Sequence, residues 1–262
     1  KPGDIMLIDF QEGKILFPDE VKTKVASKHP YRTWLNQEQV PLENLSVGPQ
    51  PEPYGMAELS RKLLCFGYSV ETIDFILLAL INEKRDPIGS MGNDEALACL
   101  SDFSKLTYQY FKQLFAQVTN PPVDPIREES AMSLRCNIGP SGNLLETSKE
   151  QARRLVVEHP ILTSEDFSRL DSLSTRNWQS QTLDTTWNHQ EGEAGLEKSL
   201  HRIRNEATQA VRNGVHFLIL TDQAVGPERT PISSLLACGA VHHALIENGL
   251  RTKVGIIVET GE

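Results

Sequence analysis

The first residues that could do chemistry form a short glycine-containing loop, Gly89-Ser90-Met91-Gly92-Asn93-Asp94. Two glycines ahead of a helix that begins near Asp94 could let backbone amides approach a phosphate. The run matches neither the dinucleotide-binding fingerprint nor the Walker pattern, however, and Asp94 would place a negative charge at the amide-rich end of the helix. We therefore interpret Gly89, Ser90, Met91 and Gly92 as a structural turn packed against a neighbouring domain.

A second candidate is the proline-rich run from Val118 to Glu129, VTNPPVDPIREE. Its prolines fix the backbone, so Thr119 and Asn120 could present their side chains and unpaired carbonyls along a polar passage. The alternative is an interface loop locked by salt bridges of Arg127. The residues alone favour that alternative.

The histidines offer no metal site and no catalytic base. His242 and His243 are adjacent on a predicted helix. They therefore point about 100° apart, whereas two ligands of one metal usually lie at positions i and i+4. No GxSxG or similar nucleophile motif accompanies them. With His216 in a predicted strand, we expect all three to pack and to form hydrogen bonds.

The cysteines are too dispersed to predict a zinc or iron–sulfur site. Three of them lie among apolar neighbours, in LLCFG, LACLS and LLACG, which are typical of helix faces. A free thiol in such a place behaves as a small hydrophobic residue, so we expect buried, reduced thiols and no metal or cofactor. The four are Cys65, Cys99, Cys136 and Cys238.

Composition indicates a soluble, folded, intracellular chain. Its 262 residues are 39% hydrophobic, which suffices for a sizeable core. A net charge of −9 and no cluster of Lys and Arg argue against nucleic acid as a partner. The longest apolar run, Phe75 to Ile81, is too short to span a membrane. The chain opens at Lys1 without an initiator Met and stops directly after a strand-like run, so we expect a domain cut from a longer polypeptide.

Hydrophobic periodicity divides the chain into three sections. Residues 1–55 predict a hairpin at 5–17, a helix that begins at Pro18, and a proline-rich surface connector from Asn36 to Pro53. Residues 56–130 predict a mainly helical section to Ala116, in which Ser69 caps a helix that buries one broad face. Residues 131–262 predict an α/β section that ends in a parallel βαβ unit. Its elements are a helix at Glu193 to Asn213, a strand at Val215 to Thr221, a crossover helix at Pro231 to Glu247 and a strand at Lys253 to Val258, preceded by an extended segment at 175–192.

Six segments in order along the chain resemble one family. Phe115 to Glu129, FAQVTNPPVDPIREE, and the glycine loop at 89–94 are joined by MSL, NLLE, HPIL and PISSLLACGAVHHALIENGLRT. Together they resemble the central domain of glutamate synthase. These four runs begin at Met132, Asn143, His159 and Pro231.

The resemblance implies a rudimentary, degenerate TIM-barrel-like α/β domain with a mostly parallel sheet and a helical N-terminal section. It implies that the partners are a glutaminase domain and an FMN-binding synthase domain of the same polypeptide, with FMN and an iron–sulfur cluster held by the synthase domain and none here. The chain itself would be non-catalytic. It would help to form an ammonia channel in glutamate biosynthesis from glutamine and 2-oxoglutarate, with Thr119 and Asn120 beside the route, in the cytoplasm or, in a photosynthetic eukaryote, the plastid.

Two alternatives remain. One is a free-standing α/β-barrel-type enzyme that acts on a phosphorylated substrate, which needs a phosphate loop and convergent acid and base residues at the carboxyl ends of strands. The other is an interaction domain without a channel.

Overall fold

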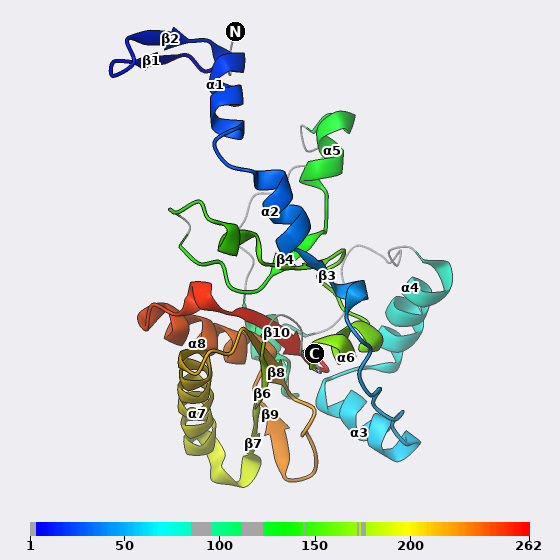
Figure 1. The fold of residues 1–262 in the computed structure, drawn as a ribbon. Coiled ribbons are helices and arrows are strands. Elements are labelled where there is room, and N and C mark those ends of the chain that lie inside the picture. Colours follow the sequence, from blue (N-terminus) through cyan, green and yellow to red (C-terminus); the bar gives the residue numbers. More distant parts are fainter. Residues whose placement is uncertain (1–3, 85–95, 112–122, 144, 172, 174–176) are drawn as a thin grey trace.

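A computed structural model describes residues 4–84, 96–111, 123–143, 145–171, 173 and 177–262 (Figure 1). At its centre lies a three-stranded parallel sheet in the order β10-β8-β6. Every residue of the middle strand is buried, as expected of a strand covered on both faces. The strands are β6 (Ser180–Asp184), β8 (Phe217–Thr221) and β10 (Gly255–Glu259).

Two helices cover one face of this sheet, α7 (Gly192–Arg212) and α8 (Ser234–Glu247) (Figure 1). Leu218 and Leu220 of β8 point into the core that these helices share with the sheet. Each helix is followed by a glycine with positive φ, Gly214 at +90° and Gly249 at +66°, where a side chain would be strained. The predicted βαβ unit and the parallel pairing of its strands are therefore confirmed.

A second, mixed sheet lies against the other face. Because side chains alternate along a strand, Phe217 and Ile219 of β8 point away from α7 and α8 and into this second core. Trp178 joins them, with its ring edge-on to Phe217 at 5.6 Å between ring centroids. The surrounding elements are β3 (Val40–Pro41), β4 (Cys136–Ile138), β5 (Leu155–Val157) and α6 (Ser164–Asp171), with strand order β3-β5-β4.

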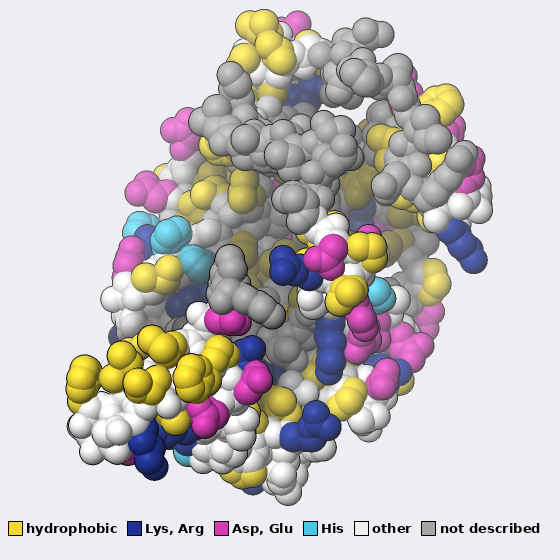
Figure 2. Space-filling model, turned by 90° about the horizontal axis from the view of Figure 1, so that it is seen from above, with side chains coloured by type: hydrophobic (Ala, Val, Ile, Leu, Met, Phe, Trp, Pro, Cys, Tyr) yellow, Lys and Arg dark blue, Asp and Glu magenta, His cyan; other side chains and the backbone are white. Residues whose placement is uncertain are grey.

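The N-terminal hairpin carries an exposed apolar surface. Strands β1 (Leu7–Asp9) and β2 (Lys14–Leu16) pair antiparallel, and α1 (Pro18–Ala26) follows with Pro18 in its first turn, as predicted. Phe10 is 91% exposed and Phe17 62% exposed. These elements, at the top of Figure 1, lie nearest the viewer in Figure 2, where hydrophobic side chains form a row.

The remaining elements are short. They are α2 (Tyr31–Glu38), η1 (Leu42–Asn44), α3 (Met56–Cys65), η2 (Thr72–Leu77), α4 (Leu78–Glu83), η3 (Ala98–Leu100), η4 (Thr107–Tyr110), α5 (Pro125–Ala131), η5 (Lys149–Ala152), β7 (Thr186–Asn188), η6 (His189–Glu191), β9 (Arg229–Pro231) and η7 (Arg251–Lys253). Among the described residues, every helix is too short or too polar to cross a membrane.

The predicted surface connector at Asn36 to Pro53 was wrong in part. Val40 and Pro41 form an edge strand, and Val40, Leu42 and Leu45 are buried in the second core. Proline is tolerated on an edge strand because one side of the strand needs no ladder hydrogen bond. The spacing of the prolines therefore excluded a central strand but not an edge strand.

The helical section was also predicted with too much burial. Ser69 does cap the helix, with its hydroxyl accepting from the Thr72 amide at 3.1 Å. The predicted core face is open, however, since Ile76 is 45% and Leu80 38% exposed. Periodicity fixes which face of a helix is apolar but not what covers it.

The fold class is thus α/β with a parallel sheet. The described strands form two three-stranded sheets and two two-stranded pairs, and they do not close into a barrel.

Candidate functional site

The carboxyl ends of the three parallel strands bring acidic side chains together. β6 ends at Asp184, Asp222 directly follows β8, and β10 ends at Glu259. In open α/β sheets, ligands bind outside these strand ends, so this edge is the candidate site.

Asp222 is the most buried of the carboxylates, at 4% exposure. Its oxygens accept a hydrogen bond from the Thr260 hydroxyl at 2.5 Å and from the Gly261 amide at 3.2 Å. Burial raises the pKa of this carboxyl above its usual 3.8; the two hydrogen bonds oppose that rise, and the charges of Glu262 and Glu259 add to it. Asp222 therefore holds the segment after β10 in place.

The other carboxylates are also bonded to the chain itself. Glu259 accepts from the Thr221 hydroxyl at 2.5 Å and from the Gln223 side-chain amide at 3.3 Å. Glu262 accepts from the Ser234 amide at 2.9 Å, at the start of α8, where a negative charge complements the helix dipole. Asp184 pairs with Arg229 and accepts from the Thr186 amide at 2.8 Å.

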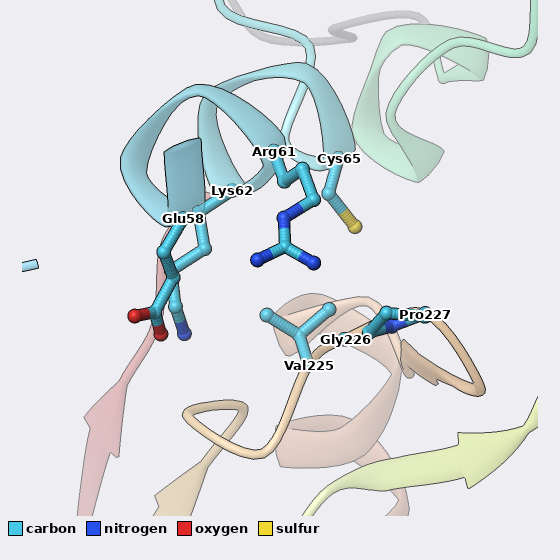
Figure 3. Close-up of a pocket in the computed structure, with 7 residues that line it drawn as sticks. All are labelled: Glu58, Arg61, Lys62, Cys65, Val225, Gly226 and Pro227. Atoms are coloured by element: carbon cyan, nitrogen blue, oxygen red, sulfur yellow. The ribbon is translucent and has the colours of Figure 1, made fainter. Parts of the chain in front are cut away.

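Two cavities adjoin this edge. A groove of about 930 Å³ runs along β10 and is lined by Tyr54, Gln223 and Glu259, among others. A smaller cavity of about 300 Å³ lies between α3 and residues 225–227, with Arg61 and Cys65 pointing into it (Figure 3). Burial, followed by the charge of Asp222, raises the pKa of the Cys65 thiol, which makes it a poor nucleophile.

Residues before, within and after helix α3 attach it to the carboxyl edge of the parallel sheet. Lys62 Nζ donates to the Gln223 carbonyl at 3.0 Å and lies 4.7 Å from the centroid of the Tyr54 ring, whose hydroxyl donates to the Gln223 side chain. Phe66, at the end of α3, packs so closely on Gly261 that a Cβ at that glycine would lie 2.3 Å from the ring.

This arrangement favours a structural role over phosphate chemistry. The groups that would meet a phosphate at the strand ends are carboxylates, and like charges repel. These carboxylates already accept hydrogen bonds from donors of the chain. Among the described residues, no three His, Cys, Asp or Glu side chains are grouped to hold a metal ion.

Most of the predicted site residues lie outside the described part of the chain. These are Gly89, Ser90, Met91, Gly92, Thr119 and Asn120. Arg127 is described: it lies in α5, its side chain is 79% exposed, and its Nε pairs with Asp124 of the same helix start at 3.3 Å. That local pair anchors no other element.

His242 and His216 form hydrogen bonds as predicted, whereas His243 is exposed. His242 Nδ1 accepts from Arg251 Nε at 2.9 Å, and its ring packs edge-on against His243. The backbone amide of Gln179 donates to His216 Nδ1 at 3.4 Å.

The cysteines are free thiols, but their predicted burial was wrong. Cys65 and Cys99 are exposed, and Cys136 and Cys238 are half-buried. The helical turns that carry the first two also expose Leu64 and Leu100.

Sequence reasoning missed the carboxylates of the strand ends. The signal was present as Thr221-Asp222 and Glu259-Thr260, each placed where a predicted strand ends. Which strand ends meet is a matter of sheet order, however, and sheet order was not predicted for β6.

Comparison with known proteins places the chain in a family. The sequence model of the glutamate synthase central domain matches residues 61–262. The chain belongs to the glutamate synthase central domain family. The predicted resemblance is thereby confirmed. A second model, of class-II glutamine amidotransferases, matches residues 1–34 of this central-domain chain.

Whole glutamate synthases align over the full chain. It is 44% identical to the NADH glutamate synthase of Schizosaccharomyces pombe, 42% to the large chain of the NADPH enzyme of Bacillus subtilis, and 37% to the chloroplastic ferredoxin-dependent glutamate synthase 2 of Arabidopsis thaliana. The central-domain chain spans 13%, 17% and 16% of the lengths of these relatives, respectively.

Proposed function

We propose that this chain is the central domain of a glutamate synthase, which links a glutaminase domain to an FMN and iron–sulfur synthase domain. The observation that carries the proposal is the presence in one chain of both family matches, the amidotransferase at residues 1–34 and the central domain at 61–262. The reaction of the whole enzyme would convert glutamine and 2-oxoglutarate into glutamate, as the names of the relatives suggest.

The hairpin gives this proposal a physical interface. Phe10 and Phe17 belong to the amidotransferase match and are largely exposed, as are Ile8 and Ile15. A row of large apolar side chains is costly in water, at about 25 cal/mol per Å². We infer that the glutaminase domain packs over this row. Residues 35–60, which include the end of α2 and all of β3, would then connect that domain to the central domain. The 262 residues would form the central region, divided into the three sections predicted from the sequence.

The chain would itself be non-catalytic and without a cofactor. The carboxylates at the strand ends disfavour the phosphate of a flavin, and the dispersed cysteines do not suit a cluster. FMN and the iron–sulfur cluster would belong to the synthase domain. The parallel sheet would form part of a degenerate barrel, and the enzyme would work in the cytoplasm, or in the plastid as the names of the plant relatives indicate for those proteins.

Ammonia released by the glutaminase domain would pass through the central domain. We place Thr119 and Asn120 beside the route, because they precede a proline-fixed turn that can hold their polar groups still. Ammonia needs donors and acceptors along its path, which an amide and a hydroxyl provide.

The test replaces Asn120 by Leu in the complete enzyme. The substitution removes the hydrogen-bonding amide and adds apolar bulk, so ammonia transfer should fall while flavin binding is unchanged. The measurement is the ratio of ammonia leaked to glutamate formed from glutamine, with the flavin spectrum recorded in parallel. The matched control is Asn205→Leu, at an exposed position of α7. A raised ratio for Asn120→Leu alone supports the route, whereas a ratio equal to that of the control reduces the loop to a structural clamp.

A further inference from the structure

Another cavity lies at the opposite edge of the parallel sheet, by the amino ends of β6 and β8. Its volume is about 480 Å³, within the range of small-molecule sites. Trp178 and His216, which precede the two strands, line it together with Asn143, Glu146 and Arg153, among others. Asn143 and Glu146 are the first and last residues of the NLLE run, to which the proposed function assigns no role.

Arg153 is the distinctive group in this cavity. Its Nε is buried and has no hydrogen-bond partner among the described residues. The guanidinium carbon lies 5.7 Å from the centroid of the Trp178 ring, so the planar group lies within cation–π distance of the indole. The neighbouring Arg154, by contrast, donates to the Gly139 carbonyl at 2.7 Å. A buried donor of a charged group that lacks an acceptor is costly, and only Arg153 leaves one in this cavity.

Among the described residues, neither carboxylate that lines the cavity forms an ion pair with Arg153. Of the two carboxylates that line the cavity, Glu146 accepts from the Asn143 side chain at 2.8 Å. The pKa of Glu150 is lowered by hydrogen bonds to its own backbone and to Ser148. His216 is the other titratable group, and burial followed by the charge of Arg153 lowers its pKa. Lys149, nearby in sequence, pairs with Glu38 at 3.0 Å.

We propose that this cavity binds a small carboxylate anion, with Arg153 as the charged donor and the Trp178 ring as the apolar wall. The fork of N–H groups on a guanidinium matches the two oxygens of a carboxylate. Water could satisfy the same donors, but a bound carboxylate would also pair directly with the guanidinium, which neither Glu146 nor Glu150 does among the described contacts. The site is independent of the proposed ammonia route, which lies in another part of the sequence.

The proposal separates binding from stability. Loss of an arginine that supports only the fold should destabilise the protein. Arg153 Nε instead has no acceptor among the described residues, so Arg153→Gln should be at least as stable as the parent protein without ligand and should lose ligand binding. A variant that is as stable as the parent but no longer binds the ligand would not be expected if Arg153 only supported the fold.

The experiment titrates the purified chain with glutarate and follows two signals. One is the thermal unfolding midpoint, which should rise and follow a saturable binding curve. The other is the pKa of His216 from imidazole NMR, assigned with a His216→Gln variant, which should rise because a bound anion favours the charged imidazole. Arg153→Gln should weaken binding roughly tenfold or more, as expected for a lost charge-assisted hydrogen bond. Arg135→Gln, an exposed arginine outside the cavity, should bind as the parent does.

Other outcomes overturn the proposal. Equal responses to glutarate and to sulfate or phosphate at matched ionic strength would show a general salt effect. Equal binding by the parent and Arg153→Gln would remove the assigned donor. If Arg153→Gln fails to fold, the test rests on the parent protein. A His216 pKa that does not change at saturating glutarate would then contradict an anion in this cavity.

Discussion

Two helical glycines should respond to the same substitution with opposite signs. Gly195 lies in the first turn of α7, where a Cβ would be 2.4 Å from the Cβ of Glu191 and 3.0 Å from the Trp187 ring. Gly239 lies within α8, and a Cβ there would meet no atom within 4 Å. Neither residue has positive φ, so the difference lies in packing alone.

The expected magnitudes follow from these distances. Replacing glycine by alanine within a helix favours folding by about 1 kcal/mol, which Gly239→Ala should show nearly in full. At Gly195 the same gain is opposed by overpacking, which costs about 1–3 kcal/mol. The Glu191 contact cannot be relieved by rotating a side chain, because its Cβ is attached directly to the backbone. We therefore expect Gly195→Ala to be destabilised by up to about 2 kcal/mol, and to be about 1–3 kcal/mol less stable than Gly239→Ala.

Urea unfolding followed by circular dichroism measures this difference. Both variants should keep the parent slope, so that the shift of the midpoint reports stability. If Gly195→Ala is as stable as Gly239→Ala, the close packing of β7 against the first turn of α7 is wrong.

Two further predictions concern the strand-end carboxylates and cofactors. Because the folded pKa of Asp222 is raised, first by burial, its stabilising contribution is complete below about pH 3.8 and is lost as the pH rises through the folded value. As the pH is lowered from 7 to 4, the free energy of unfolding of the parent should therefore rise relative to that of Asp222→Asn, as measured by urea unfolding at each pH. A difference between the two proteins that does not change with pH would contradict the raised pKa. The purified chain should be colourless after gel filtration, since its cysteines are dispersed and the flavin site is proposed to lie in another domain. A stoichiometric flavin band in the visible spectrum would refute that expectation.

The C-terminal part of the fold could be predicted because its signals are local. An apolar stripe identified α7, a continuous apolar run identified β8, and the Asn-Gly pairs at 213–214 and 248–249 marked where the helices end. Two buried strands joined through a helix then indicated a parallel βαβ unit.

The site could not be predicted in the same way, because it depends on sheet order. The segment at 175–192 was recognised as extended, but nothing in it shows that β6 pairs with β8 rather than with β10. Without that pairing, Asp184 cannot be placed beside Asp222 and Glu259, which the predicted pairing of β8 with β10 already brings to one edge. Arg153 gave no signal either, because the sequence does not show that its acceptor is missing.

The distribution of burial also explains where periodicity failed. In the described part of the chain, all but four of the buried hydrophobic residues follow residue 154, and the exceptions are Val40, Leu42, Leu45 and Phe66. In the helical section, Leu64 is 77% and Phe75 72% exposed, although both lie on amphipathic segments. An amphipathic helix needs a partner to bury its apolar face. If the chain is the centre of a larger enzyme, the partners of these faces belong to its other domains. Substitutions there would then affect how the domains assemble, while substitutions in α7, α8 and the parallel sheet would affect the folding of this chain.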